Sequence, residues 1–181
     1  MTRHPGGEAH TTRMLALAGV KPPCRILDLG AGDGETVRQL RCLGFDAWGI
    51  DLAPGHDVEH GDILNASFSD EEFDALITQC TFYVTGDPQK AFRESQRLLR
   101  PGGRLLFSDV SFGGQVTLRA AAESAGLTVL IMEDLTKIWR EYYIESIWNG
   151  TAYAMPCGCA KGKCTYWLMI CERDVKDGSV R

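Results

Sequence analysis

The sequence lacks any apolar run that approaches the roughly eighteen residues needed to span a bilayer. Its first residues are largely polar, where a secretory signal peptide would need an apolar core. It also lacks an excess of basic residues, because 19 Lys and Arg stand against 24 Asp and Glu, for a formal net charge of -5 at pH 7. We therefore expect neither a nucleic-acid backbone nor a membrane as partner. No repeat and no low-complexity linker divides the 181 residues, so one cytoplasmic domain over residues 1–181 is expected, of unknown oligomeric state.

The most informative segment is a short apolar strand that breaks into alternating glycines. The run Cys24–Leu29 has the length and the branched apolar content of a buried parallel strand. Gly30, Gly32 and Gly34 permit a tight turn and let a ligand approach where a Cβ would collide. From Glu35 to Leu43 the apolar spacing is helical, so the unpaired N–H groups of a helix N-terminus face the turn. This order predicts a site for a compact polar ligand, although a plain strand-to-helix connection has the same pattern.

A dinucleotide-binding turn would carry a third glycine, in the pattern GxGxxG, at the position of Glu35. That glycine lets the helix pack closely on the strand, and a glutamate in its place also opposes a pyrophosphate at the helix N-terminus. A ligand with a positive centre and no phosphate is compatible with Glu35. NAD is therefore disfavoured as the ligand.

A second predicted strand, Phe45–Asp51, ends in a carboxylate about twenty residues after the first glycine. A parallel neighbour would bring Asp51 to the same crevice, where a carboxylate can accept hydrogen bonds from both hydroxyls of a ribose. Further along, Asp62 can accept a hydrogen bond from an adenine amine, and the apolar Ile63 can cover the ring. These offsets favour a nucleoside ligand, and a surface aspartate at a strand end is the alternative.

The longest informative string runs from Asp87 to Asp109. It combines a predicted helix over 88–99, a stop at Pro101-Gly102-Gly103 and an apolar strand from Arg104 to Phe107. The chain thereby resembles the class I S-adenosylmethionine-dependent methyltransferases, and specifically the small-molecule branch that includes ubiquinone/menaquinone and arsenite methyltransferases. The other segments that carry this resemblance are Ile26–Gly34, Gly49–Asp51, Gly61–Asp62 and Phe73–Ile77.

The resemblance implies an α/β fold: a Rossmann-like, doubly wound seven-stranded sheet, mostly parallel with an antiparallel last strand, with helices on both faces. It implies S-adenosyl-L-methionine as cofactor and a small molecule as methyl acceptor. Asp28 and the glycines would shape the pocket of the methionine moiety, Asp51 would hold the ribose, and Gln79 would lie near the methyl group. The cofactor-binding residues implied in this way are Asp28, Gly30, Ala31, Gly32, Gly34, Asp51, Leu52, Asp62, Ile63 and Gln79.

The acceptor is expected beside Cys80, which follows the predicted strand Ala75–Thr78. A predicted amphipathic helix, Lys137–Trp148, carries an aromatic surplus. Members of the family commonly cover the acceptor pocket at this point of the chain. Trp139, Tyr142 and Tyr143 are therefore predicted substrate contacts, and an ordinary core stripe is the alternative.

Three residues are candidates for catalysis by their positions: His4, Tyr83 and Asp109. An acceptor hydroxyl or acidic carbon would need such a general base, whereas a thiol or a metalloid already offers a lone pair. His4 precedes a helix expected over residues 7–19, which in the family often folds over the cofactor. A solvated histidine near a terminus is the alternative.

Three thiols, Cys157, Cys159 and Cys164, lie on a glycine-rich loop before a predicted last strand, Thr165–Cys171. Zinc usually takes four ligands, and Cys171 would lie about 20 Å further along an extended strand. Three thiolates suit a thiophilic metalloid such as trivalent arsenic, or a metal site completed from elsewhere; cysteines without a shared guest are the alternative. The odd total of seven cysteines indicates reduced thiols in the cytosol.

These patterns predict an S-adenosylmethionine-dependent methyltransferase that aligns a small-molecule acceptor with the methyl donor and excludes water. Two alternatives remain open at this point. The first is a non-catalytic module that binds S-adenosylmethionine or senses a metal through its thiols, and the second, less favoured, is an NAD-dependent oxidoreductase.

Overall fold

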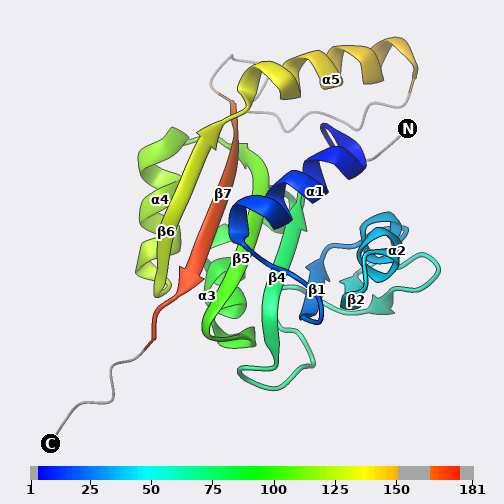
Figure 1. Ribbon diagram of the computed structural model, residues 1–181. Coiled ribbons are helices and arrows are strands. Elements are labelled where there is room, and N and C mark those ends of the chain that lie inside the picture. The colour runs from blue at the N-terminus through cyan, green and yellow to red at the C-terminus, as the bar shows by residue number, and fades with distance from the viewer. Residues whose placement is uncertain (1–3, 151–163, 176–181) are drawn as a thin grey trace, which may run out of the picture.

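The computed structural model describes residues 4–150 and 164–175, which alternate between strands and helices (Figure 1). None of the helices in these two ranges is long and apolar enough to cross a membrane. The helices are α1 Gly7–Ala18, α2 Glu35–Cys42, the 3-10 turn η1 Phe82–Thr85, α3 Pro88–Leu98, α4 Gly114–Ser124 and α5 Thr136–Trp148. The strands are β1 Arg25–Leu29, β2 Asp46–Asp51, β3 Glu59–His60, β4 Phe73–Gln79, β5 Leu99–Ser111, β6 Leu127–Asp134 and β7 Thr165–Arg173.

The strands form one seven-stranded sheet in the order β3-β2-β1-β4-β5-β7-β6. β7 runs antiparallel to both of its neighbours, β5 and β6, while the pairs from β3 to β5 are parallel. The strand order reverses between β1 and β4, so the connections that leave these two strands diverge and open a crevice at their carboxyl ends. The predicted doubly wound sheet with an antiparallel last strand is confirmed.

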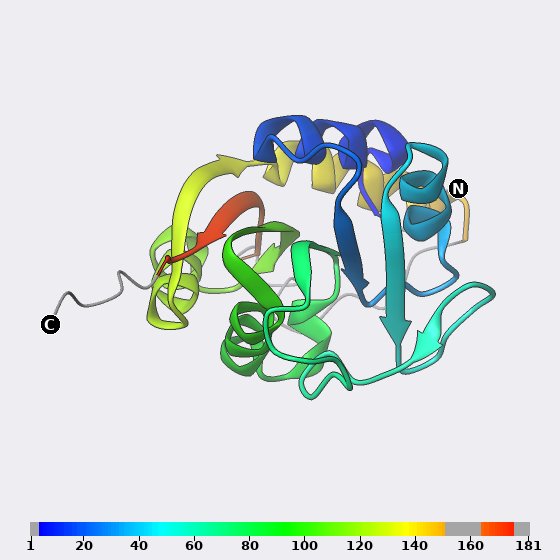
Figure 2. The same ribbon diagram turned by 60° about the horizontal axis from the view of Figure 1, so that its bottom comes forward.

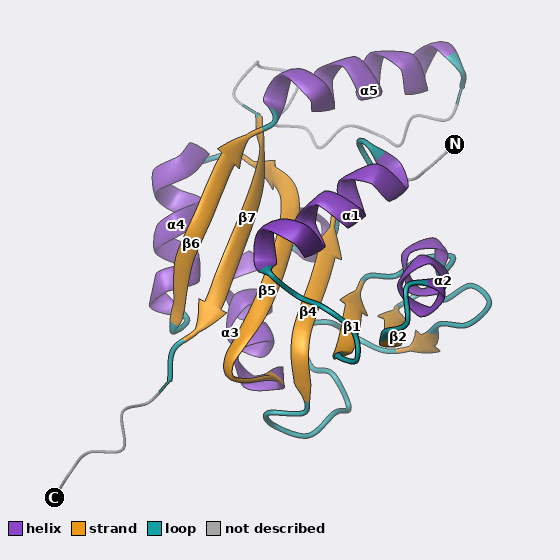
Figure 3. Ribbon diagram, viewed as in Figure 1, coloured by secondary structure: helices purple, strands orange, loops and turns teal. Residues whose placement is uncertain are grey.

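Helices cover both faces of the sheet, as Figures 2 and 3 show. On one face, Met14 and Leu15 of α1 pack with Val37 and Leu40 of α2 in one apolar cluster. On the other face, α3 and α4 pack on a second cluster that includes Phe92. Strand residues between these clusters are buried on both sides of the sheet, which explains why their sequence reads as continuous apolar runs.

Several boundaries differ from the sequence-based expectation. α3 begins at Pro88, as expected, and Asp87 is its N-cap: Oδ1 of Asp87 accepts from the N–H of Lys90 at 2.9 Å. It ends at Leu98, because Leu99 is already extended and pairs with Phe73 of β4. β5 therefore starts five residues before Arg104. At the other end of the sheet, β6 reaches Asp134 because β7 continues to pair with it.

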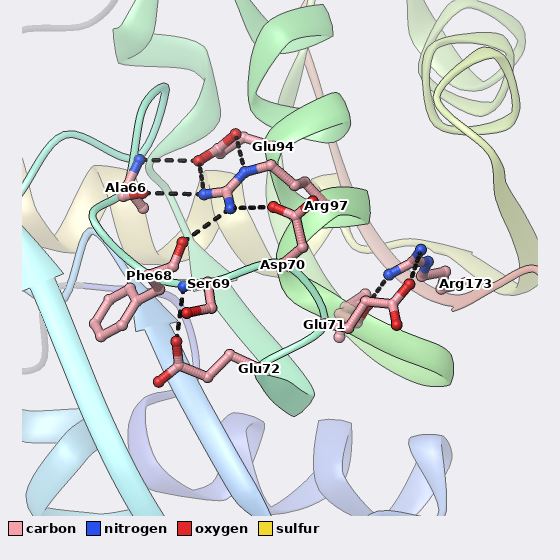
Figure 4. Close-up of polar contacts among 10 residues, drawn as sticks. Ala66, Phe68, Ser69, Asp70, Glu71, Glu72, Glu94, Arg97 and Arg173 are labelled. Atoms are coloured by element: carbon pink, nitrogen blue, oxygen red, sulfur yellow. Dashed lines mark hydrogen bonds and ion pairs between the residues drawn. The ribbon is translucent and has the colours of Figure 1, made fainter.

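Arg97 of α3 holds the loop between β3 and β4 against this helix through hydrogen bonds (Figure 4). Its guanidinium donates to the carboxylates of Glu94 and Asp70, at 2.6 and 2.7 Å, and to the carbonyl oxygens of Ala66 and Phe68. Glu94 completes the arrangement by accepting from the N–H of Ala66 at 2.9 Å. The loop that carries Asp62 is thus held in place by charge-assisted hydrogen bonds.

Arg97→Ala should lower the free energy of unfolding by about 2–3 kcal/mol, because it leaves two loop carbonyls and the Glu94 carboxylate without their donor. Urea denaturation measures this change. Arg93→Ala, at an exposed position of the same helix, is the matched control and should stay within about 0.5 kcal/mol of wild type. Equal stabilities of the two variants would show that the guanidinium contributes nothing beyond its exposed charge.

Candidate functional site

The turn after β1 adopts the conformation that its glycines permit. Gly30, Gly32 and Gly34 have φ values of 83°, 53° and 79°, in the left-handed region that other residues rarely enter. A Cβ at Gly30 would also collide with the Thr81 side chain, which comes from the loop after β4. The N–H groups of Gly30 and Ala31 both donate to the Ile50 carbonyl, at 2.9 and 3.0 Å. The turn is thereby tied to the neighbouring strand β2.

A crevice of about 60 Å³ opens over this turn. It lies at the carboxyl ends of β1 and β4, where the strand order reverses. Its lining residues are His4, Asp28, Gly30, Ala31, Gly32, Asp33, Glu35, Thr36 and Gln79.

Asp28 is a buried carboxyl group in the wall of this crevice. It is the last residue but one of β1, and it is 4% exposed. Burial raises the pKa of Asp28 to about 8, and the negative charge of Asp51 raises it further in the same direction. A cationic group in the crevice would stabilise the ionised form, so Asp28 is suited to receive a positively charged part of a ligand.

Asp51 lies at the end of β2, as the sequence predicts. Its Oδ2 accepts from the N–H of Gly32 at 2.9 Å, and its Oδ1 accepts from that of Ala53 at 2.8 Å. Each carboxylate oxygen can accept more than one hydrogen bond, so a ribose could add to these contacts. The adjacent Leu52 is 66% exposed and offers an apolar surface beside this carboxylate.

The other predicted pair, Asp62 and Ile63, lies in the loop that follows β3. Asp62 is exposed, and its Oδ1 accepts from the N–H of Leu64 at 2.8 Å. Ile63 is 6% exposed and belongs to the apolar cluster beneath α3 and α4. Neither residue lines the crevice as the structure describes it.

Gln79 joins the first helix to the crevice. Its side-chain oxygen accepts from Thr11 of α1 and Thr36 of α2, both at 3.4 Å. Its amide nitrogen donates to Nδ1 of His4 at 3.3 Å. His4 is 8% exposed, and burial lowers its pKa. The structure therefore brings two of the predicted residues, His4 and Gln79, together at the crevice.

A buried polar chain lies beside the crevice, and sequence reasoning identified only Cys80 in it. Nε2 of His10 lies 2.8 Å from Oγ of Ser108, which donates to the Tyr166 hydroxyl at 2.7 Å. The Cys80 Sγ lies 3.3 Å from the same hydroxyl. Burial raises the pKa of the Cys80 thiol well above its usual range, so the thiol stays protonated.

Tyr83 and Asp109 meet beneath η1. Asp109 is 1% exposed; its Oδ2 accepts from the N–H of Tyr83 at 3.2 Å, and its Oδ1 accepts from that of Val110 at 2.7 Å. Burial raises the pKa of Asp109 to about 7, against the opposite effect of these backbone hydrogen bonds. Asp109 thus faces the backbone of η1 and does not line the crevice.

The aromatic residues of α5 pack on the strand end. Trp139 is 8% exposed and stacks on Tyr166, with ring centroids 6.3 Å apart, and on Tyr143, at 5.9 Å. Tyr142 is partly exposed on the same helix. The buried Trp139 fits the packing alternative for this stripe better than an open substrate wall.

Of the three clustered thiols, Cys157 and Cys159 lie outside the described residues. Cys164 is 3% exposed and packs with Val110, Trp139 and Tyr166. Within residues 4–150 and 164–175, no group of three or more His, Cys, Asp or Glu side chains is arranged to hold a metal ion.

Comparison with known proteins identifies the segment that carries the crevice. Residues 27–107 match the family model described as a methyltransferase domain. An arsenite methyltransferase of Aquipseudomonas alcaligenes is 30% identical over 113 residues, which cover 48% of this chain and 33% of the relative. A demethylmenaquinone methyltransferase of Renibacterium salmoninarum is 29% identical over 123 residues, which cover 59% of this chain and 52% of the relative. The chain therefore spans a third to a half of the length of these relatives.

The solved structures agree in fold. A phosphoethanolamine N-methyltransferase of Haemonchus contortus, solved in complex with S-adenosyl-L-methionine, has a TM-score of 0.74 and 18% identity. The match covers 95% of this chain and 54% of the Haemonchus chain. At this identity the comparison supports the Rossmann-like fold alone. The match of residues 27–107 to the methyltransferase-domain model agrees with the resemblance seen in the sequence.

Gly30→Ala should destabilise the protein more than Gly19→Ala does. Both glycines have positive φ, 83° and 66°, but a Cβ at Gly19 meets nothing within 4 Å. Gly19→Ala therefore carries only the backbone cost of about 1 kcal/mol. Gly30→Ala adds the collision with Thr81 and should lose at least about 1 kcal/mol more in urea denaturation. Similar losses of unfolding free energy in the two variants would mean that the turn and Thr81 can move apart without loss of stability.

Asp28→Asn should stabilise the ligand-free protein at high pH. Below about pH 4 the carboxyl group is protonated in both states, whereas between about pH 4 and pH 8 only the folded protein keeps the proton. The free energy of unfolding of the wild type therefore falls as the pH rises through this window. The Asn variant has no carboxyl group at this position and does not show this fall. At pH 9 we expect an advantage of at least about 1.4 kcal/mol, the equivalent of one pKa unit. Urea denaturation at pH 5, 7 and 9 checks this; a constant difference would contradict the buried, protonated carboxyl group.

Proposed function

We propose that this chain, whose residues 27–107 match the methyltransferase-domain family model, binds S-adenosyl-L-methionine in the crevice after β1 and transfers its methyl group to a small-molecule acceptor. The observation that carries the proposal is the glycine turn, with the Asp28 and Asp51 carboxyl groups on either side of it. The same turn could serve a dinucleotide, but Glu35 lies in the crevice wall at the start of α2. A carboxylate there opposes a pyrophosphate and is compatible with a cationic ligand.

The residues in and near the crevice fit the parts of S-adenosylmethionine. Asp28 would pair with the ammonium group of the methionine moiety, whose positive charge favours the ionised carboxyl group. Asp51 would accept from the ribose hydroxyls. Ala31 with the glycines would border the methionine moiety, and Leu52, next to Asp51, would flank the adenine. By the resemblance, Ile63 would also flank the adenine with Asp62 near its amine, although both lie outside the crevice as described.

Bound S-adenosylmethionine supplies an electrophilic methyl group on a sulfonium; as the acceptor's lone pair bonds to it, the carbon–sulfur electron pair returns to sulfur. The protein's part is to align the acceptor and to exclude water. Gln79 and His4, which share a hydrogen bond at the crevice, would border the reacting groups. We assign Asp109 a positioning role, because its oxygens hold the backbone of η1 beside Tyr83.

The proposal of a small-molecule acceptor is supported by the names of the two relatives, an arsenite and a demethylmenaquinone methyltransferase. A thiolate site for arsenic would need Cys157 and Cys159, which lie outside the described residues, together with Cys164, which is packed in an apolar cluster. The burial of Cys164 in this cluster favours an acceptor that is not bound through thiolates.

Calorimetric titration tests the donor. Reduced wild-type protein should bind S-adenosylmethionine and S-adenosylhomocysteine with dissociation constants of about micromolar, and should not bind NAD. Asp51→Ala should weaken both adenosyl ligands by about tenfold or more, since it removes the ribose acceptor. Asp51→Asn is measured beside it, because Asp51 also holds the N–H of Gly32.

Asp46→Ala is the matched control, because Asp46 lies on the same strand at its other end and is exposed. It should leave all three titrations unchanged. Binding of NAD in place of both adenosyl ligands would refute the proposal. Binding of the adenosyl ligands without methyl transfer to any thiol, phenol or amine would instead support the non-catalytic module.

A further inference from the structure

The chain changes direction at Cys80, where β4 leaves the sheet. Gln79 is the last residue of β4 and pairs with Ser108 of β5. The next residue, Cys80, has a φ of 57°, in the left-handed region. Among the described residues other than glycine, only Asp57 and Glu71 also have a positive φ. This conformation is uncommon for a cysteine and is unfavourable in itself, so it persists only where the surrounding structure holds it.

Two neighbouring strands hold Cys80 in this conformation. Its N–H donates to the carbonyl oxygen of Ser108 on β5 at 2.9 Å. Its Sγ lies 3.3 Å from the hydroxyl of Tyr166 on β7. Tyr166 is 0% exposed, and its hydroxyl also accepts from Oγ of Ser108 at 2.7 Å. The backbone and the side chain of Cys80 are thus both bound to groups inside the sheet.

The bend at Cys80 determines where its two neighbours in sequence lie. Gln79 lines the crevice. Thr81 lies against Gly30, at the place where a Cβ of that glycine would be. The Thr81 hydroxyl also donates to the Gln79 carbonyl oxygen at 3.1 Å, so the two neighbours are joined across the bend. A different φ at Cys80 would therefore move Thr81 relative to the glycine turn and Gln79 relative to the crevice.

Cys80 itself does not line the crevice. Its side chain packs on the apolar cluster that contains Val110, Trp139 and Tyr166. Any effect of Cys80 on a ligand in the crevice must accordingly pass through Gln79 and Thr81.

We propose that Cys80 is a positioning residue of the crevice, whose left-handed backbone places Gln79 in the crevice wall and Thr81 over the glycine turn. This role rests on the proposed function, since it concerns the fit of the adenosyl ligand. It differs from the contact with the acceptor that the sequence suggested for Cys80. Because the backbone carries the effect, a residue that tolerates the left-handed region can replace the cysteine, whereas a β-branched residue cannot.

Calorimetric titration with S-adenosylhomocysteine tests this role in three variants. Cys80→Gly should bind within about threefold of wild type, because glycine adopts a positive φ freely. Cys80→Ser keeps an unbranched side chain with a polar atom for Tyr166 and should bind equally well. Cys80→Thr differs from the serine variant by one methyl group on Cβ, which disfavours the left-handed region, and should weaken binding about tenfold.

Glu71→Thr is the matched control. Glu71 has a φ of 59° and lies just before Phe73, where β4 begins, at the opposite end of the strand from Cys80. It does not line the crevice. The threonine meets the same backbone restriction there and also removes the ion pair with Arg173. The urea midpoint should therefore fall, while the affinity for S-adenosylhomocysteine stays that of wild type.

A second measurement reports on the position of Thr81 without any ligand. Gly30→Ala is expected to lose more stability than Gly19→Ala, because the new Cβ meets Thr81. If Cys80→Thr moves Thr81 away from the turn, this difference should disappear in that background. In the Glu71→Thr background it should persist, since distant sites are additive. Urea denaturation of the single and double variants measures both differences.

The inference is wrong if Cys80→Gly or Cys80→Ser binds S-adenosylhomocysteine as weakly as Cys80→Thr, or if Cys80→Thr binds as wild type does. It is also wrong if Gly30→Ala loses the same stability in every background. Should Cys80→Thr fail to fold, the affinities of the glycine and serine variants still decide, because a thiol contact predicts that both are weakened. Wild-type protein that does not bind S-adenosylhomocysteine would refute the proposed function instead, and the urea measurements would still test the bend.

Discussion

The close approach between the turn after β1 and the loop after β4 is the constraint on which the site depends. Gly30 can lie against Thr81 only because it has no Cβ. The parallel pairing of β1 with β4 brings Asp28 and Gln79 to the same crevice. The turn is also tied to β2 through the Ile50 carbonyl, so three adjacent strands contribute to one opening. Sterics in the backbone, rather than any single polar contact, set the position of the binding groups.

Local patterns predicted individual elements, whereas the family resemblance implied the sheet as a whole. The glycine turn, the carboxylate at the end of β2 and the Pro-Gly-Gly string each carry a short-range signal, and the seven-stranded sheet agrees with them. Element ends were less predictable. β5 begins at Leu99, ahead of the glycines, because Leu99 pairs with Phe73 of β4. The glycines keep an irregularity within the strand: the register shifts before Ala75 pairs with Arg104, and Gly102 has a φ of 77°. Such pairing depends on residues far away in the chain and leaves no trace in a short window.

The polar chain was missed for a related reason. His10 and Ser108 are 98 positions apart, so no local motif joins them, although Ser108 directly precedes the candidate Asp109. Asp109, by contrast, was selected from its place after an apolar strand, yet its oxygens hold the backbone beneath η1. The carboxylate of a residue at a strand end can point to either face of the sheet, and the packing of the neighbouring elements determines which groups it contacts.

The position of β7 has a consequence for how the protein is made. This strand lies between β5 and β6, so β6 has no partner in the sheet until Thr165–Arg173 has left the ribosome. Until then, an edge of β5 and both edges of β6 expose unpaired backbone groups. The half of the sheet that carries the crevice pairs earlier, from strands close in sequence, whereas the other half depends on contacts of long sequence separation. Synthesis at a reduced rate would lengthen the time during which these edges are available to chaperones or to other nascent chains.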